Sequence, residues 1–391
     1  MPPKSLFLKA LAIAAIAAPT PASAIPYFAR KYGVDCSHCH YLPPRLNDVG
    51  ENFRNSGYIL SGAAQPNSTF PFAVWASLRS DALLDEPETS NAVRRYLNRI
   101  EIISGGQIVA PWLSYFVEWR PLSLETQRRN GTVQLRDRSG RFEDLFATVS
   151  AGGLTATIGQ FRLIDQTDVS LRLSLSEPLL LSASLADPSA NPSPPTFSAR
   201  RKASLRGFSP AGRSPAIRVG WKAPISNGWS WTNTMALAFP GEVSIPLTDE
   251  ARDEASLELN SAPKGIVMES FLRKGATSYG GHLFYDSGNR WLANLVTTGG
   301  RGSAYWSGIV GLEHAASGTR GRWALEGEYF PTPAMGLGAR IENRVGDNQS
   351  PGFLPYFSTH FPGTSQTIRL TLEQRFLKGQ NTTLVELGWL F

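Results

Sequence analysis

Apolar and polar positions alternate in short segments from about residue 70 onward, and turn residues separate these segments. A period of two residues indicates β-strands with one apolar and one polar face. In the segment 366–376, aliphatic residues share one face and hydroxyl or charged residues share the other: Ile368, Leu370 and Leu372 against Thr367, Arg369, Thr371, Glu373 and Arg375. This arrangement favours a barrel with a polar lumen and a lipid-facing exterior. A soluble sandwich would place its apolar face inside, and the period alone does not separate the two architectures.

These segments predict an all-β fold, a transmembrane β-barrel of about sixteen antiparallel strands. The strands are expected to begin near Phe72, Arg94, Trp112, Phe142, Leu154, Pro215, Trp229, Glu254, Gly265, Thr277, Trp291, Ala304, Arg322, Gly336, Thr367 and Thr382. About 20 residues for each strand and its connection are enough for tilted spans of about 9–11 residues. The segment from Leu163 to Arg213 is a long insertion rich in Ser, Pro and Leu, interpreted as a surface loop, a plug or two further strands.

The last predicted strand favours the membrane barrel over the sandwich. Val385, Leu387, Trp389 and Phe391 occupy every second position up to the final residue. This pattern resembles the terminal strand of bacterial outer-membrane barrels. Aromatic residues near other predicted strand ends suit the girdles at the membrane interfaces, namely Trp112, Trp119, Trp221, Trp291, Trp306, Trp323 and Tyr329.

The first 24 residues have the features of a cleaved secretory signal. Lys4 and Lys9 flank the start of an apolar stretch that ends in a small-x-small site at residues 22–24. Pro19 and Pro21 interrupt this stretch, which is too short for a membrane anchor. The formal net charge is +6, and about +4 remains after the two lysines are removed, which does not indicate a nucleic-acid partner. We therefore expect a signal peptide at 1–24, a haem domain at 25–68 and a barrel at 69–391.

The haem domain is predicted from the motif Cys36-Ser37-His38-Cys39-His40. Two thiols three positions apart match the two vinyl groups of one porphyrin, and the adjacent imidazole reaches its iron. Cys36 and Cys39 would bind haem c covalently, and His40 would be an axial ligand. A disulfide, a zinc site and a thioredoxin-like redox pair are alternatives, but zinc lacks a second ligand pair and the redox motif lacks its βαβ context.

The second axial ligand is not evident from the sequence. Met335, in a proline-rich turn, is the residue singled out, and an open coordination position is an equal alternative. The other candidates are His38, Met235, Met268, His282, His314 and His360. A methionine on a strand usually fills space in a core, and an isolated histidine is usually a solvated polar group. Only about thirty residues follow His40 before the first strand, too few to fold without the haem or the barrel.

Acidic residues on inward positions offer a candidate cation path, with Glu326, Glu328, Glu373 and Glu386 as its members. Carboxylates attract hard cations. Alternating charges in a lumen more often keep it wet and pair with arginines such as Arg369 and Arg375.

The N-terminal part of the chain resembles the fused cytochrome–porins, of which the best-known members are outer-membrane monohaem cytochromes of iron-oxidising bacteria. The likeness covers about 35 residues and is carried by segments 26–33, 36–40 and 44–47 with Gly50, Phe53 and 57–58. The resemblance implies a haem domain in or beneath the lumen of a barrel in the bacterial outer membrane. It also implies electron transfer from extracellular Fe(II) to a periplasmic c-type cytochrome.

Three functions follow as hypotheses. The first is an outer-membrane electron conduit, an iron(II) oxidoreductase in its most specific form. The second is a porin-type diffusion channel whose haem domain is a plug or gate. The third is a periplasmic β-protein with a haem sensor.

Overall fold

The structure is a computed structural model. It describes residues 26–58, 60, 72–83, 94–109, 112–129, 132–137, 139–164, 173–175, 213–239, 243, 263, 265–287, 289–315, 318–345, 351–362, 367–377 and 380–390. The predicted signal peptide, the expected domain boundary at 68/69, the predicted strand near Glu254 and the terminal Phe391 lie outside these residues.

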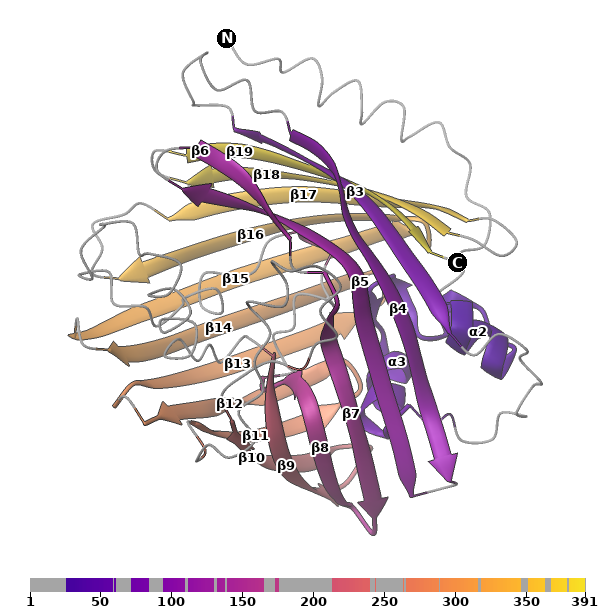
Figure 1. The fold of residues 1–391 in the computed structure, drawn as a ribbon. Coiled ribbons are helices and arrows are strands. Elements are labelled where there is room, and N and C mark those ends of the chain that lie inside the picture. The colour runs from indigo at the N-terminus through magenta and orange to yellow at the C-terminus, as the bar shows by residue number, and fades with distance from the viewer. Residues whose placement is uncertain are drawn as a thin grey trace.

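Within the described chain, sixteen antiparallel strands form a closed barrel (Figure 1). They are β3 (Ala73–Leu83), β4 (Arg94–Val109), β5 (Leu113–Arg129), β7 (Arg141–Ala151), β8 (Leu154–Arg162), β9 (Arg213–Pro224), β10 (Ser230–Ala238), β11 (Gly265–Lys274), β12 (Thr277–Asp286), β13 (Trp291–Arg301), β14 (Ala304–Ala315), β15 (Gly318–Thr332), β16 (Met335–Val345), β17 (Gly352–Pro362), β18 (Thr367–Leu377) and β19 (Gln380–Leu390). A further strand, β6 (Thr132–Asp137), pairs with the second half of β5, while β5 itself pairs with β7. The wall closes where β19 pairs with β3.

The predicted barrel of about sixteen strands is confirmed. β10 pairs directly with β11, and the strand expected near Glu254 lies outside the described residues. The structure also contains β17, which the alternation did not indicate. Pro355 and consecutive aromatic residues hide the period of two in this segment.

The two faces of the wall differ as the pattern indicates. On β18, Thr367, Thr371 and Glu373 are at most 1% exposed, so the polar face is the inner one. Outward positions carry aliphatic side chains that no other part of the described chain covers, and Leu295 and Leu325 are 68% and 60% exposed. An apolar exterior around a polar interior is the pattern of a membrane barrel.

Aromatic side chains are also exposed on the outside of the barrel. The tryptophans and tyrosines at least 43% exposed in the described residues are Trp112, Trp221, Trp231, Trp306, Tyr279, Tyr285 and Tyr329. Indole and phenol rings are enriched where lipid meets water, so they suit the predicted girdles. Among the helices that the structure describes, none is long and apolar enough to cross a membrane.

An N-terminal segment of residues 26–58 precedes the wall. It contains helix α2 (Pro26–Tyr32), the 3-10 turn η1 (Cys36–His38), the short strands β1 (His40–Leu42) and β2 (Arg45–Leu46), and helix α3 (Asp48–Asn55). The Asn47 side chain accepts hydrogen bonds from the backbone N–H groups of Val49 and Gly50 and so caps α3. The short stretch after His40 is therefore a two-stranded ladder followed by a capped helix.

The N-terminal segment is held at the end of the barrel where the short turns gather. Ala276, in the two-residue turn between β11 and β12, donates its N–H to the Asp48 carboxylate at 2.7 Å. Tyr41 stacks on Phe330, near the turn between β15 and β16, with ring centroids 5.3 Å apart. Figure 1 shows α2 and α3 at this end, near the end of β19.

Part of the long insertion also lies inside the barrel. Leu173 is buried with Leu42, Tyr305 and Phe330 in one apolar cluster. Leu175 donates its N–H to the Glu373 carboxylate at 2.6 Å. For residues 173–175 the structure therefore favours the plug among the three interpretations of the insertion, and 165–172 and 176–212 lie outside the described residues.

Candidate haem site in the barrel lumen

The cysteine-rich motif forms a tight loop resting on α3. The Cys39 N–H donates to the Cys36 carbonyl at 3.0 Å, and the Asn47 N–H donates to the Cys39 carbonyl at 3.0 Å. Gly50 permits this contact, since a Cβ at that position would lie 2.0 Å from the Cys39 carbonyl oxygen. The loop and α3 are therefore built as one unit, with both cysteines and His40 within a few residues of the helix.

Both thiols are free, so the disulfide alternative is not realised in this structure. Burial, with a smaller contribution from Asp35, raises the pKa of Cys36 to about 12. Burial also raises the pKa of Cys39.

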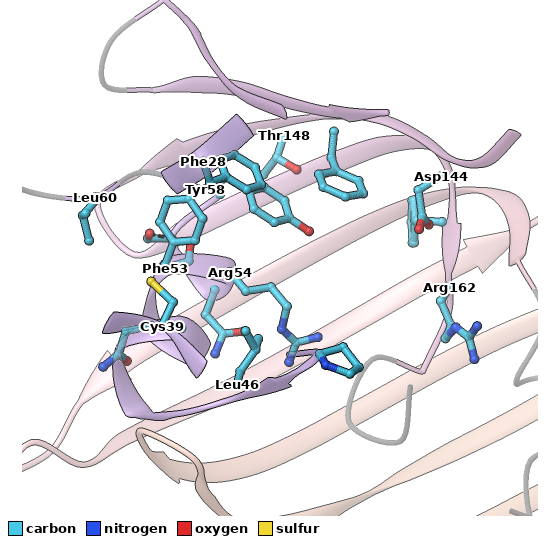
Figure 2. A pocket seen from close by; sticks show the side chains of 18 of the residues that line it. Phe28, Cys39, Leu46, Phe53, Arg54, Tyr58, Leu60, Asp144, Thr148 and Arg162 are labelled. Atoms are coloured by element: carbon cyan, nitrogen blue, oxygen red, sulfur yellow. Dashed lines mark hydrogen bonds between the residues drawn. The ribbon is translucent and has the colours of Figure 1, made fainter. Parts of the chain in front are cut away.

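A cavity of about 970 Å³ opens beside the motif inside the barrel. Cys39 and His40 line it, together with Phe28, Tyr32, Pro43, Pro44, Leu46, Phe53, Tyr58 and Trp75. Figure 2 shows the Cys39 side chain on the side of Phe53 and Leu46, with Asp144 and Arg162 across the cavity. Cys36 is 1% exposed and is not among the lining residues. The structure thus brings two of the three predicted haem residues to the cavity and leaves the third buried one turn away.

His40 presents a neutral imidazole to this region. Burial lowers its pKa to about 4, against smaller opposing effects from backbone interactions at Pro44 and Arg45. Its Nδ1 atom has no hydrogen-bond partner in the described part of the chain. A neutral ring is the form that binds metals.

The residues around the cavity fit a covalent haem. The pair of thiols with an adjacent imidazole is the donor set for this cofactor. The volume is at the upper end of the usual range for cofactor sites, about 300–1,000 Å³. Phe28, Phe53 and Tyr58 form an aromatic cluster at its edge, and the parallel rings of Phe28 and Tyr58 have centroids 5.6 Å apart. Such aromatic side chains suit a porphyrin ring. The rest of the lining includes charged side chains, among them Arg99, Arg120 and Arg369.

The candidate second ligands lie in very different places. Met335 begins β16 and is not among the cavity-lining residues. Met235 and Met268 face each other on neighbouring strands and are exposed by 42% and 47%. The remaining histidine candidates also lie in different surroundings.

His282 is bonded through Nε2 to Asn294, His314 stacks on Trp291 at a strand end, and His38 closes the 3-10 turn at the surface. His360 alone of the β-region candidates within the described residues lines the cavity that contains His40. Sequence reasoning could list His360 but could not choose it, because only the strand register places it there.

The predicted lumen carboxylates are paired with donors. The partners are Arg45 for Glu328, Tyr356 for Glu326, Arg375 for Glu373 and Arg369 for Glu386, all at 2.8–2.9 Å. Among the described residues, no group of three or more His, Cys, Asp or Glu is arranged to hold a metal ion. The arrangement therefore favours the second interpretation of these carboxylates, pairing with arginines in the lumen, over a path for cations.

Arg45 was not predicted as a functional residue. Its guanidinium contacts both carboxylate oxygens of Glu328, at 2.5 and 2.9 Å, and lies 4.0 Å from the centre of the Tyr305 ring. Its position after Pro44 gave no sign of a buried partner on a distant strand.

Comparisons with known proteins extend to the fold. No protein-family model and no curated protein sequence matches the chain. Three porin structures align with 82% of it. An anion-selective porin from Comamonas acidovorans aligns over 97% of its own chain, with 10% identity and a TM-score of 0.48. Salmonella typhi OmpF in complex with daunomycin aligns over 97% of its chain, with 9% identity and a TM-score of 0.48, and OmpT of Vibrio cholerae over 96%, with 9% identity and a TM-score of 0.45. The strand pairing of this chain itself shows a closed barrel of sixteen antiparallel wall strands among the described residues, which is the strand number of a porin-like barrel.

Proposed function

We propose that this protein is an outer-membrane electron carrier with one covalent haem c, bound by Cys36 and Cys39 and ligated by His40. The observation that carries the proposal is that Cys39 and His40 line a large cavity inside the barrel. When bound, the haem iron supplies a one-electron couple between ferrous and ferric states.

The ends of the barrel suggest the direction of access. Outer-membrane barrels have short turns on the periplasmic side and long loops outside. The N-terminal segment contacts the short-turn end through Asp48 and Tyr41. An external donor would therefore approach through the lumen, and a periplasmic acceptor would meet the N-terminal segment. In the simplest balance, extracellular Fe(II) gives one electron and becomes Fe(III), and a periplasmic c-type cytochrome accepts that electron.

The test begins with the cofactor. The full-length chain, produced in a Gram-negative host that attaches haem c, is expected to carry one haem by intact mass and to stain for haem after denaturation. Cys36→Ser with Cys39→Ser is expected to remove the haem, whereas His38→Ala, at a variable motif position, is expected to retain it. A processed chain without a porphyrin adduct would refute the proposal.

The donor is tested separately. Rapid mixing of the oxidised protein with Fe(II) is expected to give the spectrum of ferrous haem. Full haem loading with no reduction at any tested pH would rule out Fe(II) as donor while leaving the cofactor assignment intact.

The barrel also favours a second function, a diffusion channel with the N-terminal segment as plug. The closed wall and polar lumen are the specific observations for it. This function predicts solute or ion conductance in planar bilayers that persists when Cys36 and Cys39 are replaced by serine. A barrel that conducts nothing with or without the cysteines would exclude it.

A further inference from the structure

We propose that His360 of β17 supplies the second axial ligand of the haem iron, so that the N-terminal segment and the barrel wall each contribute one imidazole. This inference rests on the proposed haem and adds to it the identity of the second ligand.

The first observation is an unexplained buried polar group. His360 is 4% exposed, and neither Nδ1 nor Nε2 makes a hydrogen bond of good geometry within the described residues, although the Pro43 backbone lies near the ring. Leaving a buried polar atom unpaired costs about 1–3 kcal/mol, so such atoms are rare in native proteins. On the same wall, His282 has one ring nitrogen bonded, Nε2 to Asn294, and only Nδ1 unpaired. An iron atom would give the His360 ring a partner of good geometry for the nitrogen that does not face Pro43.

The second observation is location. His360 and His40 line the same cavity as Cys39. His40 and the backbone of Pro43 also interact electrostatically with the His360 ring. Ligating histidines commonly orient one ring nitrogen toward a backbone carbonyl and offer the other to the metal. Pro43 is placed for that supporting role.

The third observation is rigidity. The backbone N–H of His360 donates to the backbone carbonyl of Ala334 at 2.8 Å, which ties β17 to the turn before β16. Across the strand pair, His360 lies opposite Arg369. Arg369 is itself fixed by Glu386 at 2.8 Å and lies 4.6 Å from the centre of the Trp75 ring. A ligand on a strand held from both sides keeps its position better than one on a loop.

Met335 is the main competitor, and the structure places it less favourably. It lies opposite Thr359, next to His360 in the register, but is absent from the cavity lining. A methionine ligand would raise the haem potential relative to a second imidazole, so the two assignments differ measurably.

The experiment uses the full-length, haem-loaded protein in detergent. The wild type is expected to be low-spin by electron paramagnetic resonance and to lack the far-red sulfur-to-iron band of methionine ligation. His360→Ala is expected to lose the low-spin signal while keeping its covalent haem, and added imidazole is expected to restore it. Met335→Leu, the matched control, is expected to leave the spectrum unchanged.

His360→Met provides a second test that retains a ligand in the same place. It is expected to stay low-spin, to gain the far-red band and to have a higher potential than the wild type. Heat-modified mobility on gels checks that each variant keeps its barrel. An unchanged spectrum in both His360 variants, or a high-spin Met335→Leu protein, would overturn this inference alone. Absence of haem from the wild type would instead refute the proposed function.

Discussion

The ion pair between Arg45 and Glu328 gives the sharpest prediction about how the N-terminal segment is held. Both side chains are almost fully buried, at 5% and 3% exposure, and the guanidinium contacts both carboxylate oxygens. Burial would lower the pKa of Arg45, but Glu328 and Tyr305 outweigh it and raise the pKa above its ordinary value. The arginine is therefore charged, and its replacement leaves a buried carboxylate with weaker donors at Tyr356 and Leu173.

Removing one partner of a buried ion pair typically costs about 3–5 kcal/mol. Because this pair joins the N-terminal segment to the wall, the cost falls on docking of the segment rather than on the barrel. At about 1.4 kcal/mol for each factor of ten, Arg45→Met should raise the undocked population about one hundred- to a few thousand-fold.

Limited proteolysis of the detergent-solubilised protein measures this population, because cleavage follows the open fraction when opening and closing are fast. The control is the double variant Arg45→Met with Glu328→Gln, which removes both charges and is expected to recover most of the protection. Equal cleavage of the wild type and Arg45→Met would refute the reasoning. A double variant more sensitive than Arg45→Met would refute it as well.

Three further predictions concern other contacts. Gly50→Ala would place a Cβ against the Cys39 carbonyl and should destabilise the N-terminal segment by about 1–3 kcal/mol, measured by the same proteolysis assay. Gly327→Ala is the control and should have little effect, because a Cβ there would have no atom within 4 Å. Asp48→Ala removes a charged acceptor from the turn between β11 and β12 and should cost about 1.5–3 kcal/mol, seen as faster amide hydrogen exchange there; unchanged exchange would contradict the contact. Leu295→Arg on the outer face should lower the free energy of unfolding from lipid vesicles by about 2–4 kcal/mol, measured with denaturant. Ile225→Arg, in a turn, should lower it by about 1 kcal/mol or less. Equal losses would contradict a lipid-facing wall.

The wall was predictable because its physical signal is local. Alternation along β18 separates an apolar face from a polar one, and the polar face is buried in the structure. β17 was missed because Pro355 and neighbouring aromatic side chains interrupt the alternation. The expected number was still about sixteen, because the expected strands also included one near Glu254, which lies outside the described residues.

The haem motif could be proposed from the sequence for a different reason, since its thiols and imidazole are adjacent in the chain. The proposed role of His360 depends on the pairing of β17 with β18 and on how the N-terminal segment docks. Neither can be read from local sequence, because a lone histidine on a strand has the same pattern whether or not it faces a cofactor. Arg45 and Glu328 are likewise separated by most of the chain.

The seam between β19 and β3 also sets an order of events during biogenesis. The first and last wall strands meet only after every strand between them has been delivered to the membrane. The N-terminal segment leads the chain out of the secretion channel, yet its resting place is complete only when that seam forms. A haem bound as proposed would therefore have to be attached before the seam closes, while the segment is still accessible. Closure of the wall would then separate chains with the cofactor from chains without it.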